Sequence, residues 1–260
     1  MASERRSTAA FFDIDQTLVR GASSYHLARE LYWHDFFSFR DIAFAFRQSL
    51  LYLLLGEDPN RIDKIVRRAL RAMKGHSVAE VMAIGADFVT DLYDERLFAG
   101  TVNILRQHQA LGHEVWLVSA TPQEVTGLLA QRVGATGSLG TQVATTDDGV
   151  YLEELRTPLM HGDAKARAVK QLAAERNIDL AASWAYSDSK SDLPLLSLVG
   201  HPVAINPDTA LREHAKAHGW PIADFRGGIR FLHTRSARRS AYLAGGVWVA
   251  TTLLRRFPRR

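Results

Sequence analysis

The residues best suited to chemistry are aspartates in two short segments of the chain. Asp13 and Asp15 are separated by one residue, and Asp188 and Asp192 lie within the run SDSKSD at 187–192. An aspartate can attack a phosphoryl group as a nucleophile, which splits hydrolysis into formation and breakdown of an acyl phosphate. A second carboxylate two residues on can protonate the leaving alcohol and later deprotonate water. Asp13 and Asp15 could divide these two roles, but their spacing alone is common, so the interpretation depends on the residues that gather around them.

Four aspartates gathered at one place would repel one another unless a cation neutralised them. Oxygen ligands without His or Cys favour a hard ion, and we expect Mg²⁺. Lys165 can add an ammonium group to such a site. Magnesium beside a lysine suits a phosphate dianion, because both compensate its charge and the charge that develops during transfer. The chain has no cysteine, which excludes disulfides, zinc–thiolate sites and thiol catalysis.

An alternation of strands and helices is expected to bring these residues together. Polar residues follow strands predicted at 9–14, 115–119 and 184–187, and a further strand is predicted at 202–205. Helices are predicted at about 102–111, 123–133, 163–176 and 208–217, with a hairpin turning at 147–149. In parallel α/β sheets, ligands lie outside the carboxyl ends of the strands. We therefore expect an α/β fold, a Rossmann-like parallel sheet with helices on both faces.

The segment between the first strand and residue 100 has helical periodicity and almost no strand signal. Helices are predicted at about 25–33, 40–55, 61–73 and 78–97, separated by Gly and Pro breakers. This pattern indicates an all-helical cap domain inserted after the first strand. The expected divisions are a catalytic core (1–19 and 100–228), a cap (20–99) and a basic, apolar tail (229–260).

Four motifs in this order resemble those of the haloacid dehalogenase (HAD) superfamily. The resemblance is to subfamily IB, the phosphoserine phosphatase-like group with a helical cap after the first strand. FFDIDQTL at 11–18 is similar to the first motif and LVSAT at 117–121 to the second. Lys165 fits the third motif, and SDSKSDLP at 187–194 is similar to the fourth. The resemblance covers roughly residues 9–225.

The resemblance implies a role for each matched residue. Asp13 would be the nucleophile and Asp15 the acid/base, with Lys165 as the third catalytic residue. Ser119 would hydrogen-bond the phosphoryl group. The expected phosphate-binding residues are Ser119, Ala120, Lys165 and Thr17. The expected metal set is Asp13, Asp15 through its main-chain carbonyl, Asp188, and Asp192 as support for the metal shell.

The substrate is less defined than the chemistry. Phosphoserine phosphatases usually place a glutamate shortly after the first motif to hold the amine, whereas segment 19–24 here has no acid before Glu30. This absence disfavours phosphoserine. The predicted cap is rich in aromatic residues and leucine between 31 and 55. We favour packing between helices as their role; the alternative is an apolar pocket or a membrane-facing patch for a partly hydrophobic substrate.

The C-terminal tail is distinct in charge from the rest of the chain. Nine arginines and no acidic residue lie in 226–260, so the remainder is net acidic, and we expect no nucleic-acid partner. Segment 241–254 is an uncharged run of fourteen residues, short of the ~20 that a spanning helix needs. It can lie in a membrane interface or dock on the protein as a last helix. We expect a cytoplasmic protein, with peripheral contact to the inner face of the membrane as the open question.

These observations predict an Mg²⁺-dependent phosphomonoesterase for a small phosphorylated metabolite or a lipid-related phosphate. A phosphotransferase or mutase would use the same residues with another acceptor. A non-catalytic phosphate-binding module is the alternative from another class, and the intact acids in every motif argue against it.

Overall fold

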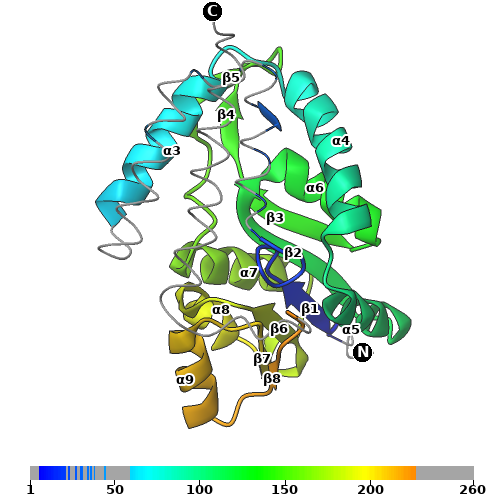
Figure 1. Ribbon diagram of the computed structural model, residues 1–260. Coiled ribbons are helices and arrows are strands. Elements are labelled where there is room, and N and C mark those ends of the chain that lie inside the picture. The colour runs from blue at the N-terminus through cyan, green and yellow to red at the C-terminus, as the bar shows by residue number, and fades with distance from the viewer. Residues whose placement is uncertain are drawn as a thin grey trace, which may run out of the picture.

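A computed structural model describes residues 6–21, 23, 27, 30, 31, 34, 36, 38, 44 and 59–226 of the 260-residue chain. At its centre is a six-stranded sheet in the order β3-β2-β1-β6-β7-β8 (Figure 1). All its strand pairs are parallel. The strands are β1 (Ala9–Phe12), β2 (Glu114–Pro122), β3 (Gly137–Thr141), β6 (Trp184–Ser187), β7 (His201–Ile205) and β8 (Ile222–Ala223). The predicted parallel sheet is confirmed.

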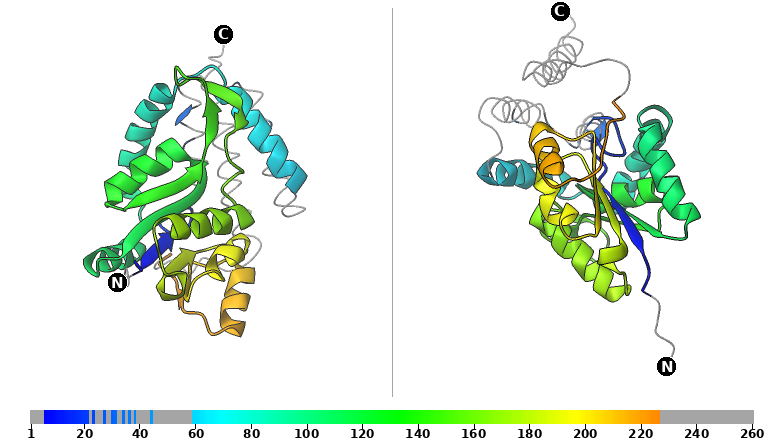
Figure 2. Two further views of the ribbon diagram at one scale, coloured as in Figure 1. Left: turned by 180° about the vertical axis from the view of Figure 1, so that it is seen from behind. Right: turned by 90° about the horizontal axis from the view of Figure 1, so that it is seen from below.

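Helices cover both faces of this sheet (Figure 2). They are α5 (Ala99–Ala110), α6 (Gln123–Val133), α7 (Asp163–Glu175), α8 (Leu193–Leu196) and α9 (Thr209–Ala217). Successive side chains of β1 belong to different buried clusters, one on each face of the sheet, because side chains alternate along a strand. Ala10 and Phe12 pack on the side of α5 and α6, whereas Ala9 and Phe11 pack with α7, α8 and α9. The apolar run at 9–12 is therefore buried on both faces.

The insert between β1 and α5 contains two long helices, α3 (Pro59–Met73) and α4 (Val78–Glu95). Helix α4 begins at a capping box, in which the Ser77 hydroxyl accepts from the Glu80 N–H and the Glu80 carboxylate accepts from the Ser77 N–H. Helix α4 packs on α6 of the core. Helix α3 packs on an antiparallel hairpin, β4 (Val143–Thr145) and β5 (Tyr151–Leu155), whose turn lies where it was predicted.

The chain enters and leaves the insert through two neighbouring segments. The Arg20 N–H donates to the Arg96 carbonyl at 2.8 Å, and the Phe98 N–H donates to the Leu18 carbonyl at 2.9 Å. An antiparallel bridge between Val19 and Leu97 lies between these bonds. The two crossings therefore form a short two-stranded junction between insert and core.

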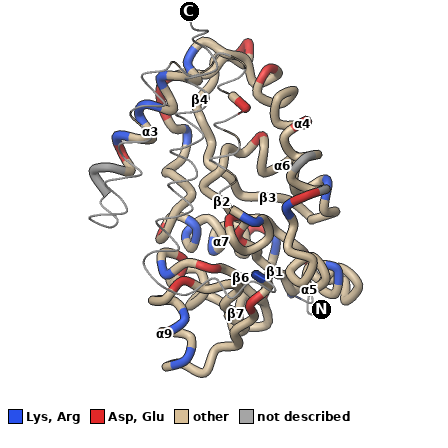
Figure 3. The backbone as a smooth tube through the Cα atoms, viewed as in Figure 1, with Lys and Arg blue, Asp and Glu red and all other residues tan. Residues whose placement is uncertain are grey.

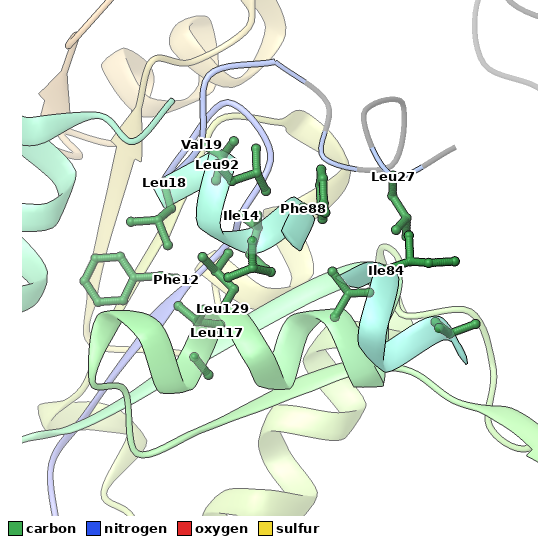
Figure 4. Packing of buried hydrophobic residues seen from close by; sticks show 14 of the residues in the cluster. Phe12, Ile14, Leu18, Val19, Leu27, Ile84, Phe88, Leu92, Leu117 and Leu129 are labelled. Carbon is green, nitrogen blue, oxygen red and sulfur yellow. The ribbon is translucent and has the colours of Figure 1, made fainter. Parts of the chain in front are cut away.

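Apolar side chains join the insert to the sheet (Figure 4). Leu27, Ile84 and Phe88 of the insert belong to the same buried cluster as Phe12 and Leu129 of the core. Leu31 and Phe36, two members of the apolar stretch noted in the sequence, are also buried in it. Phe36 also stacks on the His76 ring, with centroids 3.7 Å apart. Most of the stretch from 31 to 55 lies outside the described residues, so packing between helices stays a prediction for it.

The cap helices predicted at 25–33 and 40–55 and the tail at 229–260 fall largely or wholly outside the described residues, so they stay predictions. Within the part of the chain that the structure describes, no helix is long and apolar enough to cross a membrane. The domain limits at 20, 99 and 228 likewise remain proposals.

Candidate active site

The centre of the site is the end of β1, where Asp13 leaves the sheet. The Asp13 N–H donates to the Tyr186 carbonyl of β6 at 2.9 Å, which continues the ladder by one bond. The Lys165 ammonium, from the first turn of α7, donates to Asp13 Oδ1 at 2.5 Å and to Asp192 Oδ2 at 2.8 Å. All three side chains are buried. In the view of Figure 3, acidic and basic positions appear close to one another around the labels of β1, β2 and α7. Three separate motifs therefore meet in one ion-pair network.

Asp192 is held from the other side by β6. The Ser187 hydroxyl donates to Asp192 Oδ2 at 2.7 Å, so this oxygen accepts from both Ser187 and Lys165. The other oxygen, Oδ1, is buried and has no hydrogen-bond partner among the described residues. Ser187 lies in the fourth motif, but the sequence alone does not indicate a role for it. Its hydroxyl orients Asp192, the residue expected to support a metal shell.

A chain of hydroxyls connects Asp15 to Ser119. The Ser23 N–H donates to Asp15 Oδ1 at 2.7 Å, and the Ser23 hydroxyl lies 2.9 Å from the Thr121 hydroxyl. The Ser119 hydroxyl donates to Thr121 Oγ1 at 3.1 Å and accepts from the Thr121 N–H at 3.1 Å. Both acid/base and phosphate-binding candidates are thus fixed by Ser23, which belongs to the insert. Sequence reasoning missed Ser23, because its segment carries no motif.

Two other predicted phosphate-binding residues have different surroundings. Ala120 is exposed, and its carbonyl accepts from the Thr141 hydroxyl at 2.7 Å, which anchors this loop. Thr17 is buried; its carbonyl accepts from the Thr101 hydroxyl at 2.7 Å, and its own hydroxyl has no partner among the described residues. Thr121 could also cap the helix that follows, but α6 begins at Gln123 with Pro122 as its N-cap residue and has no side-chain cap. Contact of Thr17 and Ala120 with phosphate stays a prediction.

Burial dominates the electrostatics of the carboxyl groups. It raises the pKa of Asp13 to about 7, against the attraction of Lys165, and the charges of Asp192 and Asp15 raise that pKa further. Burial also raises the pKa of Asp15. For Asp188, burial and then the charges of Asp13 and Asp192 raise the pKa well above its usual range. The carboxylates are close enough to destabilise one another when all are charged.

Lys165 responds in the opposite sense to its surroundings. Burial alone would lower the pKa of its ammonium, but Asp13 and Asp192 outweigh that effect and raise the pKa. The amine therefore stays protonated at neutral pH. One ammonium faces several carboxylates, and this imbalance is what a divalent cation would correct.

The donor set of the site fits a magnesium ion. The acids are all aspartates, the hard oxygen ligands that Mg²⁺ prefers, and Asp192 Oδ1 accepts no hydrogen bond from any residue that the structure describes. Among the described residues, no three His, Cys, Asp or Glu side chains form a ready-made metal cage. The expected metal site needs fewer than three such side chains. Asp13 and Asp188 would bind the ion through their carboxylates, and Asp15 would bind it through its main-chain carbonyl.

The raised pKa values predict how stability depends on pH without metal. The folded-state pKa of Asp13, about 7, exceeds the ordinary aspartate value of 3.8, so the folded protein binds more protons than the unfolded chain between pH ~4 and ~7. We expect the free energy of unfolding to fall as pH rises through this window. Saturating Mg²⁺ should reduce that fall, because the cation favours the charged carboxylates. Urea unfolding at pH 4.5, 6 and 7.5, with and without MgCl₂, measures this; a slope unchanged by Mg²⁺ would contradict it.

Comparison with known proteins gives consistent matches. A model of the haloacid dehalogenase-like hydrolase family matches residues 10–197. The phosphoserine phosphatase SerB1 of Mycobacterium tuberculosis is 42% identical over 221 residues, covering 85% of this chain and 71% of that protein. A crystal structure of a Bordetella pertussis protein of unknown function has a TM-score of 0.73 at 29% identity, covering 85% of this chain and all of that one. A phosphoserine phosphatase with a phospho-aspartyl intermediate analogue has a TM-score of 0.59 at 15% identity, covering 87% and 97%, a likeness of fold alone.

Proposed function

This chain belongs to the haloacid dehalogenase-like hydrolase family, and from that premise we propose that it is a phosphatase acting through a phosphoaspartate at Asp13. The observation that carries the proposal is the buried Lys165 ammonium bound to both Asp13 and Asp192. It joins residues from the first, third and fourth motifs at the carboxyl edge of a parallel sheet, where such folds bind ligands. The ion pairs of Lys165 with Asp13 and Asp192 distinguish this site from a strand end whose acidic residues have no catalytic role.

The proposed reaction has two steps. In the first, a carboxylate oxygen of Asp13 attacks phosphorus in line with the ester oxygen. The P–O bond to the leaving alcohol breaks, the alcohol takes a proton from Asp15, and an acyl phosphate remains on Asp13. In the second, Asp15 takes a proton from water, which attacks phosphorus and releases inorganic phosphate and the Asp13 carboxylate. Burial raises the pKa of Asp15, which favours the protonated form that the first step requires.

The surrounding residues bind and neutralise the phosphoryl group. Ser119 would donate a hydrogen bond to it by turning its hydroxyl proton away from Thr121 Oγ1 while still accepting from the Thr121 N–H. Lys165 balances its negative charge. Asp13, Asp188 and the carbonyl of Asp15 would hold Mg²⁺, with Asp192 supporting that set. The ion would supply further positive charge next to the phosphoryl oxygens. The hydrogen bonds that run from Asp15 through Ser23 and Thr121 to Ser119 fix the acid/base residue relative to the phosphate-binding hydroxyl.

We infer a small phosphomonoester as the substrate. The relative from M. tuberculosis is named a phosphoserine phosphatase. The present chain lacks an acid between Asp15 and Glu30 that could hold an amine as those enzymes do. A phosphorylated metabolite without that requirement, or a lipid-related phosphate, therefore fits better. Transfer to another acceptor, as in a phosphotransferase or mutase, would use the same first step.

A generic aryl phosphate tests the proposed activity. Release of inorganic phosphate should require Mg²⁺ and should stop when EDTA removes it. The same assay on phosphoserine, histidinol phosphate, glycerol phosphate and lysophosphatidic acid would rank substrates. Failure to release phosphate from any of them, with the protein folded and Mg²⁺ present, would favour a phosphate-binding module instead.

A contact of the tail with lipid is a separate proposal. Its support is the run at 241–254 flanked by arginine pairs, which is typical of interfacial segments. Deletion of residues 236–260 is expected to lower binding to anionic liposomes, because basic residues near a surface each contribute about 1 kcal/mol. Co-sedimentation with phosphatidylglycerol-containing vesicles measures this. Equal binding by the full and shortened chains would contradict the proposal.

A further inference from the structure

The turn that follows β7 lies between the two loops that carry the aspartates. It contains Asn206 and Asp208, separated by Pro207, and none of the motifs includes it. We propose that Asn206 and Asp208 are positioning residues that fix the two loops relative to each other and so set the affinity of the site for a divalent cation. This inference rests on the proposed function, since it concerns the metal which that function needs.

Asn206 binds the first loop. Its Nδ2 donates to the Gln16 carbonyl at 2.8 Å, and its Oδ1 accepts from the Phe225 N–H at 2.6 Å. The side chain is 1% exposed, so both bonds are shielded from water. Gln16 is adjacent to Asp15 and has a φ of 58°, a left-handed conformation that non-glycine residues rarely adopt. The Asn206 amide therefore holds the strained residue next to the acid/base.

Asp208 binds the second loop at two points. Its N–H donates to the Asp188 carbonyl at 2.7 Å, and its Oδ2 accepts from the Lys190 N–H at 3.1 Å. Its other oxygen caps helix α9 by accepting from the Leu211 N–H at 2.8 Å. On the side of the loop both bonds are made by main-chain atoms, the Asp188 carbonyl and the Lys190 N–H. They therefore fix the path of the backbone from 188 to 190. The direction of the Asp188 side chain depends on that path.

The turn itself has little freedom to adjust. Asn206 has a φ of 47°, which Asn tolerates better than most residues, and the ring of Pro207 fixes the next φ. The Asn206 N–H donates to the Ala223 carbonyl at 2.8 Å, which ties the turn to β8. A stiff segment thus bonds to both loops. Groups that orient metal ligands in this way typically change metal affinity by 10–100-fold when they are lost.

Two substitutions remove one contact each. Asn206→Asp keeps the acceptor for Phe225 but loses the donor to Gln16. Asp208→Ser keeps a good helix cap, because serine is favoured at that position, but is too short to reach Lys190. In each variant we expect Mg²⁺ and Mn²⁺ to bind about 10-fold more weakly in isothermal titration calorimetry without substrate. At saturating Mg²⁺, kcat for an aryl phosphate should stay within about threefold of wild type, since no reacting group has changed.

The controls separate this role from a structural one. Asp179→Ser makes the same change at another N-cap, where Asp179 accepts from the Ala181 N–H, and should leave metal affinity unchanged. Asp188→Asn should abolish binding and so locate the ion at this site. A variant that lowers Tm but binds metal within twofold of wild type would show a structural role only and overturn the inference. If wild type bound neither ion, the metal-dependent function would fall as well.

Discussion

Asp13→Asn is expected to lower kcat for an aryl phosphate by a factor on the order of 10⁴ to 10⁶, the range seen when a nucleophile is removed from a hydrolase. The amide is nearly the same size as the carboxylate and can keep its place at the end of β1, where the Asp13 N–H bonds to the Tyr186 carbonyl. It cannot form the acyl phosphate, however, because a neutral amide oxygen is a poor nucleophile. Loss of activity with the fold retained would assign the chemistry to this residue.

The measurement is phosphate release at saturating Mg²⁺, with circular dichroism to verify folding. Asp148→Asn, in the exposed turn between β4 and β5, provides a matched control. An Asn-Gly turn is as favourable as the Asp-Gly turn that it replaces, so activity and Tm should not change. Equal rates for wild type and Asp13→Asn would rule out the phosphoaspartate mechanism.

Lys165→Met is expected to damage both stability and activity. It leaves Asp13 and Asp192 buried without their shared ammonium, and breaking a buried pair in this way costs about 3–5 kcal/mol. The cost should shrink toward pH 5, because Asp13, whose pKa is raised by burial, can then take up a proton. With substrate, the variant also loses a cation at the phosphoryl group, and kcat/KM should fall by about 10²–10³-fold.

Chemical unfolding at pH 5 and pH 7.5, together with kinetics at saturating Mg²⁺, measures both effects. Lys170→Met removes an exposed ammonium from the same helix, α7, and should change neither quantity appreciably. A pH-independent loss of stability in Lys165→Met would contradict the role of the neighbouring carboxylates. Unchanged kcat/KM would remove Lys165 from the proposed machinery.

Periodicity predicted the long elements of the fold but not the short glycine-rich strand. Helix α6 has its predicted bounds and α7 lies within one residue of its own, because amphipathic patterns extend over three turns. Strand β3, GSLGT, has no aromatic or β-branched residue except its last, and so it was not predicted. A Cβ at Gly137 would lie 2.5 Å from the Trp116 ring, and one at Gly140 would lie 2.6 Å from the Gln123 backbone. Glycine is required at these two positions by close contacts with residues elsewhere in the fold, and a local sequence pattern does not reveal such contacts.

Some residues of the site could likewise be predicted from the sequence, and others could not. Asp13, Lys165 and Asp192 could be grouped from sequence, since each follows a strand or begins a helix of a recognisable motif, and the structure brings these three together. Ser23 and Asn206 could not be found in this way. Neither lies in a motif, and each has a hydrogen-bond partner far along the chain, Thr121 for Ser23 and Gln16 for Asn206. Contacts of this kind follow from how the chain turns in space.

The paired crossings at 18–20 and 96–98 have a consequence for how this fold can diversify. Because the insert begins and ends at neighbouring points joined by two backbone hydrogen bonds, its length is not constrained by the sheet. A different helical segment, or a short loop, could be grafted there while β1 and the aspartates that follow it keep their places. Selectivity would then evolve as an exchangeable module, with Ser23 as the residue that each replacement must supply again to hold Asp15.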